Sequence, residues 1–447
     1  MKYQKKIHEY INLHKEEIIN TLKEIVKIPS VRGKAETGAP FGKECANVLE
    51  HIKTLYEQND YNTYLDADSG FLLSYYGKGK KSIGLFAHAD VVPVSDDWIY
   101  TKPFEPLIKD GFLIGRGVSD NKSAVVISLY CAKILKEQNI PFNSRLVMFT
   151  GSNEESGMND ISAYTTKHKA PDFSIVADTE FPLYRGDKGI LRFVASSGKK
   201  MQNISDFSGG KSFNIVLGEA TAKIGDIIFT EKGISSHCAL PEGSQNAAFL
   251  LSKELSENEF LCDSDKEEML FIAKTLENYY GEVFGIENTD HIFGKLTCAN
   301  GIIGMNDGKI NLSFDMRYGK STDIKVAKER IVKYFKENGW TVEFVDELAA
   351  WITDTDNLYL KACLKAYEDY TGTKKSPTYV NAGATYAAHL PCAVEVGTQI
   401  WQKPDFDLPV GHGGAHQPDE CISIDGMLEA LEITVNMLLA CDRAEEA

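Results

Sequence analysis

The chain lacks the cysteine spacing of a thiolate metal site or a disulfide framework. Its nine cysteines are odd in number and scattered, and no Cys-x-x-Cys pair occurs among them. Thiolate zinc sites place paired cysteines only about two to four residues apart. We therefore expect free thiols, which are typical of a reducing compartment, and a cytoplasmic protein.

Two further absences narrow the classes of function. No apolar run approaches the roughly 20 residues that span a membrane. Residues 1–28 lack the continuous apolar core of a signal peptide and instead predict an amphipathic helix. The net charge of −16 leaves no excess of Lys and Arg to neutralise phosphates. We therefore expect neither nucleic acid nor a membrane as a partner. The apolar positions of the predicted helix are Ile11, Leu13, Ile18, Ile19, Leu22 and Ile25.

The first part of the chain alternates short apolar runs with helical patterns. The 447 residues exceed what one ordinary hydrophobic core serves, so several domains are expected. Residues 82–88, 145–151 and 173–178 have the composition of buried strands, and a helical pattern begins at Ser123. This order predicts a largely parallel sheet with helices on both faces.

The middle of the chain has a different pattern. Residues 212–218, 226–233 and 309–319 are short alternating runs, and residues 242–280 predict a helix. Such an order predicts antiparallel strands with helices on one face. The first pattern returns near residue 356 with a helix that ends at Gly372. We therefore predict an α/β protein in which residues 1–182 and 355–447 form one domain and residues 183–354 form an inserted α+β domain.

Six acidic and histidine residues lie at the ends of these segments or in the adjoining loops. In a parallel sheet the carboxyl ends of the strands meet at one edge, where ligands bind. Two histidines and three carboxylates can hold a pair of divalent metals if one carboxylate is shared, and an additional glutamate is then free to act as a base. This combination indicates metal-assisted hydrolysis. The six residues are His88, Asp120, Glu154, Glu155, Asp178 and His416.

Three residues of this set, and Asp90 beside His88, also have an ordinary structural interpretation. Asp90 either accepts the second imidazole N–H of a ligating His88 or caps a turn. Asp120 either bridges two metals or caps the helix that follows. Glu154 and Glu155 are either an exposed loop pair or a general base beside a ligand.

The residues also leave the last ligand and the metal open. His412 lies four residues before His416 and is a rival ligand. Imidazole ligands favour zinc, whereas carboxylates also admit manganese or cobalt. The expected cofactors are therefore two divalent metal ions, zinc or else manganese or cobalt.

The set as a whole resembles a family of two-metal hydrolases. That family includes carboxypeptidase G, aminoacylase, acetylornithine deacetylase, succinyl-diaminopimelate desuccinylase and the bacterial dipeptidase peptidase V. The matching motifs occur in the family's order over nearly the whole chain. They are HADVVP at 88–93, GRGVSDNK at 115–122, NEESG at 153–157, VADTEFP at 176–182, GISSHCALPEGSQNA at 233–247, NLSFDMRYG at 311–319 and AHQPDE at 415–420.

The resemblance implies a role for each site residue. Glu154 is the general base, and the peptide bond between Asp120 and Asn121 is expected to be cis. The implied ligands are His88 and Asp178 for one metal, Glu155 and His416 for the other, and Asp120 for both.

The resemblance also implies how a substrate is held. The inserted domain acts as a lid, and its His237 stabilises the oxyanion. Arg317 and the loop from Gly383 to Thr385 hold the terminal carboxylate of the substrate. Asn246 either orients the substrate or shapes the lid loop.

The chain most resembles the peptidase V-like dipeptidases, through DTEFPLYRGDKGI, GGKSFNIVLGEATAKI and NAGATY. This implies a cytoplasmic metallodipeptidase that acts on unblocked dipeptides as a monomer or homodimer. An N-acyl amino acid deacylase and a catalytically silent binding protein are the alternatives. Two segments depart from the subgroup: residues 383–386, which read Gly-Ala-Thr-Tyr, and residues 397–417. Both lie near the expected substrate site, so they concern specificity rather than catalysis.

Overall fold

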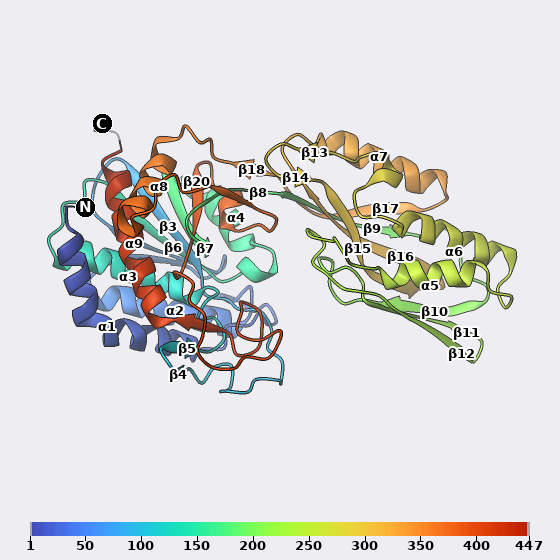
Figure 1. The fold of residues 1–447 in the computed structure, drawn as a ribbon, viewed down its shortest axis with the longest axis horizontal. Helices are drawn as coiled ribbons and strands as arrows, with labels where there is room; N and C mark the ends of the chain where they lie inside the picture. The colour runs from blue at the N-terminus through green and yellow to red at the C-terminus, as the bar shows by residue number, and fades with distance from the viewer. Residues whose placement is uncertain (1, 445–447) are drawn as a thin grey trace. The chain divides into compact units, whose positions relative to one another are not determined.

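The computed structural model describes residues 2–444, which form two compact units (Figure 1). Within these residues, unit 1 consists of 2–186, 353–379 and 385–444, and unit 2 consists of 187–352 and 380–384. All nine cysteines lie in the described part of the chain and are free thiols, as predicted. None of the described helices is both long and apolar enough to cross a membrane.

Unit 1 is built on a mixed sheet whose strands run in the order β1, β2, β6, β3, β7, β20, β8. The central strands β6, β3, β7 and β20 are parallel, whereas β1, β2 and β8 pair antiparallel at the two sides. The predicted α/β class with a mainly parallel sheet is therefore confirmed. The strands are β1 (Asn62–Asp66), β2 (Phe71–Tyr76), β3 (Ser82–His88), β6 (Arg145–Gly151), β7 (Phe173–Thr179), β8 (Tyr184–Asp187) and β20 (Ala393–Gly397).

Helices and shorter elements complete unit 1. A small antiparallel sheet contains β4 (Leu107–Lys109), β5 (Phe112–Ile114) and β21 (Cys421–Ser423). The helices are α1 (Gln4–Val26), α2 (Lys43–Gln58), α3 (Lys122–Glu137), α4 (Asn159–Lys167), α8 (Leu358–Thr371) and α9 (Ile424–Asp442), with 3-10 turns η1 (Glu154–Ser156) and η3 (Tyr386–His389).

The central strands are continuous apolar runs because both of their faces are buried. Leu85 of β3 and Met148 of β6 share one core with α1, α3 and α9, which pack against one another (Figure 1). The next residues in sequence, Phe86 and Phe149, point to the opposite face, where their rings lie 5.9 Å and 5.1 Å from that of Tyr164 in α4. Helices on both faces thus fix the sheet whose edge carries the candidate ligands.

The amphipathic helix predicted at the N-terminus is α1, and five of its six predicted apolar positions are buried. The prediction was wrong for Leu13, which is 80% exposed. The buried positions recur at helical spacing on one stripe, and residue 13 lies two positions beyond Ile11, on the far side of the helix.

Unit 2 is an antiparallel sheet of seven strands, in the order β12, β11, β10, β15, β16, β9, β17. Its three helices bury their apolar faces in one core with that sheet. The strands are β9 (Gly189–Ser196), β10 (Ile204–Gly209), β11 (Glu219–Ile224), β12 (Ile227–Lys232), β15 (Thr297–Asn306), β16 (Lys309–Tyr318) and β17 (Thr341–Leu348). The helices are α5 (Ala247–Ser256), α6 (Asp263–Leu276) and α7 (Ile324–Glu337). Shorter elements are η2 (Glu282–Phe284), β13 (Thr289–Asp290) and β14 (Gly294–Lys295). Two further short strands, β18 (Trp351–Ile352) and β19 (Tyr379–Asn381), lie where the chain passes between the two units.

Two predictions of local structure in unit 2 were wrong. The single helix predicted over 242–280 is two helices, because the Asn258 side chain accepts the backbone N–H of Phe260 and turns the chain. Residues 212–218 are not a strand of the sheet. They form an isolated bridge from Ile215 to His237, with Val216 donating to the carbonyl of Ser236.

Candidate active site

Three parallel strands bring the predicted ligands to one edge of the unit 1 sheet. His88 is the last residue of β3, Asp178 is the last but one of β7, and Glu154 and Glu155 follow β6 in the turn η1. Since β6, β3 and β7 are neighbours and parallel, their carboxyl ends lie side by side. Residues that are far apart in the sequence therefore lie close together at this edge of the sheet.

Asp120 lies between two histidines. Its Oδ1 is 3.0 Å from Nε2 of His88, and its Oδ2 is 3.0 Å from Nε2 of His416. His88 Nε2 is also 3.6 Å from Asp178 Oδ1, and His416 Nε2 is 3.1 Å from Glu155 Oε2. The two oxygens of one carboxylate therefore face two separate histidine and carboxylate pairs, as a bridging ligand requires.

Several atoms of this cluster are buried electron donors that face one another. The Nδ1–H of His88 donates to the backbone carbonyl of Asp90 at 3.0 Å, so Nε2 is the ring nitrogen that faces Asp120 and Asp178. His88 Nε2 and Glu155 Oε1 are buried and make no hydrogen bond within the described residues. A ring lone pair and carboxylate oxygens repel unless a cation lies between them, so the residues fit divalent metal ions.

Burial and crowding also oppose the negative charges of the cluster. Burial, followed by the charge of Asp120, raises the pKa of Glu155 to about 7. Burial raises the pKa of Asp178 to about 6, and burial and the charge of Asp178 raise the pKa of Glu154 well above its usual range. Carboxylates packed this closely stay ionised when a cation compensates them.

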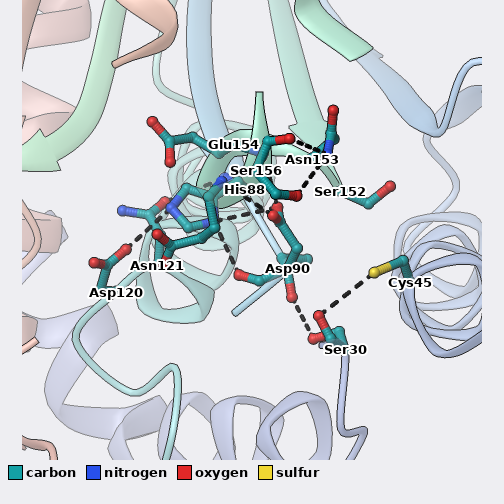
Figure 2. Close-up of polar contacts among 12 residues, drawn as sticks. Ser30, Cys45, His88, Asp90, Asp120, Asn121, Ser152, Asn153, Glu154 and Ser156 are labelled. Atoms are coloured by element: carbon teal, nitrogen blue, oxygen red, sulfur yellow. Dashed lines mark hydrogen bonds and ion pairs between the residues drawn. The ribbon is translucent and has the colours of Figure 1, made fainter. Parts of the chain in front are cut away.

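Asp90 holds the turn that carries Glu154 and Glu155 (Figure 2). Its Oδ1 accepts the backbone N–H of Glu154 and its Oδ2 accepts that of Glu155, both at 3.1 Å. The carboxylate was predicted to orient His88, but Oδ1 lies 3.5 Å from His88 Nδ1, and the Asp90 carbonyl makes the closer contact. Asp90 therefore positions the base and the ligand through their backbone.

A buried ion pair that the sequence did not indicate ties together the loops of Asp120 and His416. Glu420 Oε2 accepts from Arg116 Nη1 at 2.7 Å and from Gly117 N at 3.0 Å. Its Oε1 accepts from the backbone of Ser119 at 2.8 Å and of Asp120 at 3.0 Å. Arg116 also donates through Nη2 to the carbonyl of His416 at 3.1 Å.

Asn121 fixes the other side of the bridging residue. Its Nδ2 donates to the carbonyl of Ala177 at 2.6 Å and to Asp178 Oδ1 at 2.7 Å, and its Oδ1 accepts the backbone N–H of His88 at 3.2 Å. The peptide bond between Asp120 and Asn121 is cis, as predicted. The Asn121 side chain therefore connects the segment of Asp120 to β3 and β7.

The rival ligand His412 lies in a different environment from His416. Its Nδ1 is 2.7 Å from Asp419 Oδ2, and Asp419 also accepts the backbone N–H groups of Ile99 and Tyr100. His416 instead faces Asp120 and Glu155. The geometry therefore favours His416 as the ligand.

The remaining predicted site residues in unit 2 have local partners of their own. His237 accepts the backbone N–H of Ala239 at Nδ1, and burial together with the charge of Arg317 lowers its pKa. The ring is therefore neutral near pH 7 and carries its proton on Nε2, as a hydrogen-bond donor does. Asn246 caps α5 by accepting from Ala248 and Phe249, and it donates to the carbonyl of Asn300.

The predicted carboxylate-binding residues Arg317 and Thr385 have hydrogen-bond partners within the protein. Arg317 donates to Asp315 and, through Nη1, to the carbonyl of Ala382 at 3.0 Å, so it supports the loop of Gly383. Thr385, which belongs to unit 1, caps η3 and donates to Glu395. The roles of Arg317, Gly383, Thr385, His237 and Asn246 toward a substrate stay predictions.

Comparisons with known proteins agree with this geometry. Residues 84–440 match the sequence profile described as Peptidase family M20/M25/M40. A Staphylococcus epidermidis protein named "Putative dipeptidase" is 26% identical over 480 residues, which cover 98% of this chain and 99% of that one. A Staphylococcus aureus protein with a similar name is 25% identical over 470 residues, covering 95% and 97%.

Three solved structures of peptidases have the same fold. Human carnosine dipeptidase 1 has a TM-score of 0.62 at 15% identity and covers 98% of this chain and 100% of its own. A di-peptidase of Saccharomyces cerevisiae has a TM-score of 0.62 at 15% identity, covering 98% of each chain. An M20 family metallo-carboxypeptidase of Sulfolobus solfataricus has a TM-score of 0.62 at 18% identity, covering 95% and 99%. At these identities the likeness establishes the fold alone.

We predict that Glu420→Gln weakens metal binding about 10- to 100-fold, because an amide cannot accept from all four donors around Glu420. Titration calorimetry of metal into the stripped protein measures the affinity. The matched control is Glu24→Gln, which changes an exposed glutamate of α1. An affinity equal to that of the control would show that the Glu420 contacts do not position Asp120.

Proposed function

The chain belongs to Peptidase family M20/M25/M40, and from that membership we propose that it is a metal-dependent dipeptidase acting on unblocked dipeptides. The observation that carries the proposal is the carboxylate of Asp120, whose two oxygens lie 3.0 Å from two different histidines. The names of the similar staphylococcal proteins support the peptide substrate.

We propose that His88 and Asp178 hold one ion, that Glu155 and His416 hold the other, and that Asp120 is shared. Nitrogen and oxygen donors of this kind suit zinc, and manganese or cobalt as alternatives. Two such ions would act as Lewis acids. They would lower the pKa of the attacking water toward neutral pH and polarise the scissile carbonyl.

In this proposal Glu154 moves the proton. Its carboxylate accepts the proton of the attacking water and then delivers it to the nitrogen of the leaving amine. Two features support this role. The backbone of Glu154 is fixed by Asp90 at 3.1 Å, and burial raises the pKa of its carboxyl. A raised pKa makes the carboxylate a stronger base than an exposed one.

His237 is proposed to stabilise the oxyanion. Its neutral ring accepts from Ala239 at Nδ1, so Nε2–H is available to donate. A donor of this kind lowers a barrier by about 3 kcal/mol. Arg317 and the loop from Gly383 to Thr385 keep their proposed role toward the terminal carboxylate. Asn246 shapes the start of α5 in this proposal.

The proposal places the protein in the cytoplasm, as a monomer or a homodimer. Free thiols at all nine cysteines, which lie within residues 2–444, support a reducing compartment. An N-acyl amino acid deacylase would use the same ligands and base, and it differs only in the group that meets the amino end of the substrate.

A substrate panel tests the function. Protein stripped of metal should be inactive, and reloading with zinc, manganese or cobalt should restore hydrolysis of free dipeptides but not of N-acetylated dipeptides or N-acyl amino acids. Product amines are measured by chromatography, and chelator added after reloading is the control. Cleavage confined to acylated substrates would contradict the dipeptidase proposal.

Glu154→Gln should lower kcat by roughly 10²- to 10⁴-fold, because the amide cannot accept a proton from water. Metal content, measured by atomic emission, should remain that of the unmodified protein. Glu24→Gln again serves as the control. His88, Glu154 and Asp178 are close enough together to hold a metal ion between them. If the Glu154 variant lost a metal, we would conclude that Glu154 is a ligand and not the general base.

A further inference from the structure

A cavity of about 580 Å³ in unit 1 lies against the proposed metal ligands. Asp120 and Asp178 form part of its wall, and so do the residues that follow each of them, Asn121 and Thr179. Ligand pockets in proteins have volumes of about 300–1,000 Å³, so the cavity is large enough for a substrate residue. Because two proposed metal ligands line the cavity, a substrate group bound in it would lie beside the bond that is hydrolysed.

Another part of the wall comes from the segment that departs from the peptidase V pattern. The strand β20 is parallel to β7 and ends at Gly397, so the chain leaves the sheet beside Asp178. The cavity-lining residues of this segment begin at Thr398 and end at Ala415. A part of the chain that is unusual in sequence therefore forms a wall next to the proposed metal site.

The cavity is lined by acidic side chains. The charged side chains that line it are those of Asp120, Asp178 and Glu180, and neither Lys nor Arg occurs among its described lining residues. Asp120 and Asp178 belong to the proposed ligand set, whereas Glu180 does not. Because the proposed metal ions would compensate Asp120 and Asp178, Glu180 is the acidic lining residue left to pair with a substrate group, and a carboxylate pairs with an ammonium. The cavity therefore suits the amino end of a peptide rather than its carboxyl end.

Another part of the wall is apolar. The Phe181 ring stacks on that of Tyr367 with centroids 5.6 Å apart, and both rings line the cavity. Phe112 and Leu408 line it too, and so does Trp401, although 71% of that residue is exposed. Binding of a large apolar side chain against this surface is favourable because it removes apolar area from water. An acidic side chain would lose its hydration there without a cation to compensate its charge.

We propose that this cavity binds the amino-terminal residue of a dipeptide, with Glu180 pairing with the ammonium and the aromatic wall accepting a large apolar side chain. The proposal rests on the proposed dipeptidase function and adds a selectivity to it. The enzyme prefers aromatic or large aliphatic residues at the amino-terminal position and rejects Asp and Glu there.

Steady-state kinetics with Ala-Ala, Phe-Ala, Ala-Phe and Glu-Ala tests the preference in the metal-loaded protein. Hydrolysis of Ala-Ala establishes the dipeptidase function before selectivity is considered. We expect kcat/KM for Phe-Ala to exceed that for Glu-Ala at least tenfold, which is within the discrimination that apolar pockets achieve. Relative to Ala-Ala, kcat/KM should increase more for Phe-Ala than for Ala-Phe.

Two variants assign the preference to the cavity. Trp401→Ala should lower the ratio of kcat/KM for Phe-Ala to that for Ala-Ala about fivefold. Its control is Val410→Ala, which changes a fully exposed residue of the same segment that does not line the cavity. Glu180→Gln should raise KM for free dipeptides about tenfold while kcat is kept, and Glu24→Gln is its control. The side chains of Trp401 and Glu180 are exposed, so both variants should fold.

Each contrary result has a distinct meaning. Equal kcat/KM for Phe-Ala and Glu-Ala, a preference seen only in Ala-Phe, or variants that match their controls would overturn the assignment of the cavity and leave the dipeptidase function standing. A change in kcat but not KM for Glu180→Gln would overturn the ammonium contact. Failure to hydrolyse any dipeptide would overturn the proposed function, and the assignment of the cavity with it.

Discussion

The repulsion among buried carboxylates at one sheet edge is the constraint on which the site depends. Asp120 lies between His88 and His416, with one carboxylate oxygen 3.0 Å from each histidine. Glu155 and Asp178 lie nearby, and burial raises the pKa of both carboxyl groups. Cations between these groups relieve the repulsion, and contacts from the surrounding fold hold the donors in place. Asp90 and the pair of Arg116 and Glu420 do this through backbone hydrogen bonds.

Much of this arrangement can be predicted from the sequence because buried parallel strands carry a strong local signal. The apolar runs that end at His88 and near Asp178 define two strands, and the carboxyl ends of parallel strands meet at one edge. The cluster follows from that rule once the strands are known. The shared role predicted for Asp120 came from the resemblance to the two-metal hydrolases, which the motifs carry in the family's order.

Contacts between distant segments could not be predicted in the same way. Arg116 and Glu420 are 304 residues apart, and no periodicity links them. The wall formed by residues after β20 depends on the position of that strand beside β7, which sequence alone does not give. Local errors had local causes: Asn258 breaks a helix by binding a backbone N–H, and Leu13 lies off the apolar stripe of α1.

A crystal structure of the metal-loaded protein, with anomalous scattering recorded at the absorption edge of the metal, tests the central claim most directly. The account predicts two anomalous peaks, one on each side of the Asp120 carboxylate. One peak should have His88 and Asp178 as its other ligands, and the second should have Glu155 and His416. A single peak, or a peak coordinated by His412 in place of His416, would contradict the account.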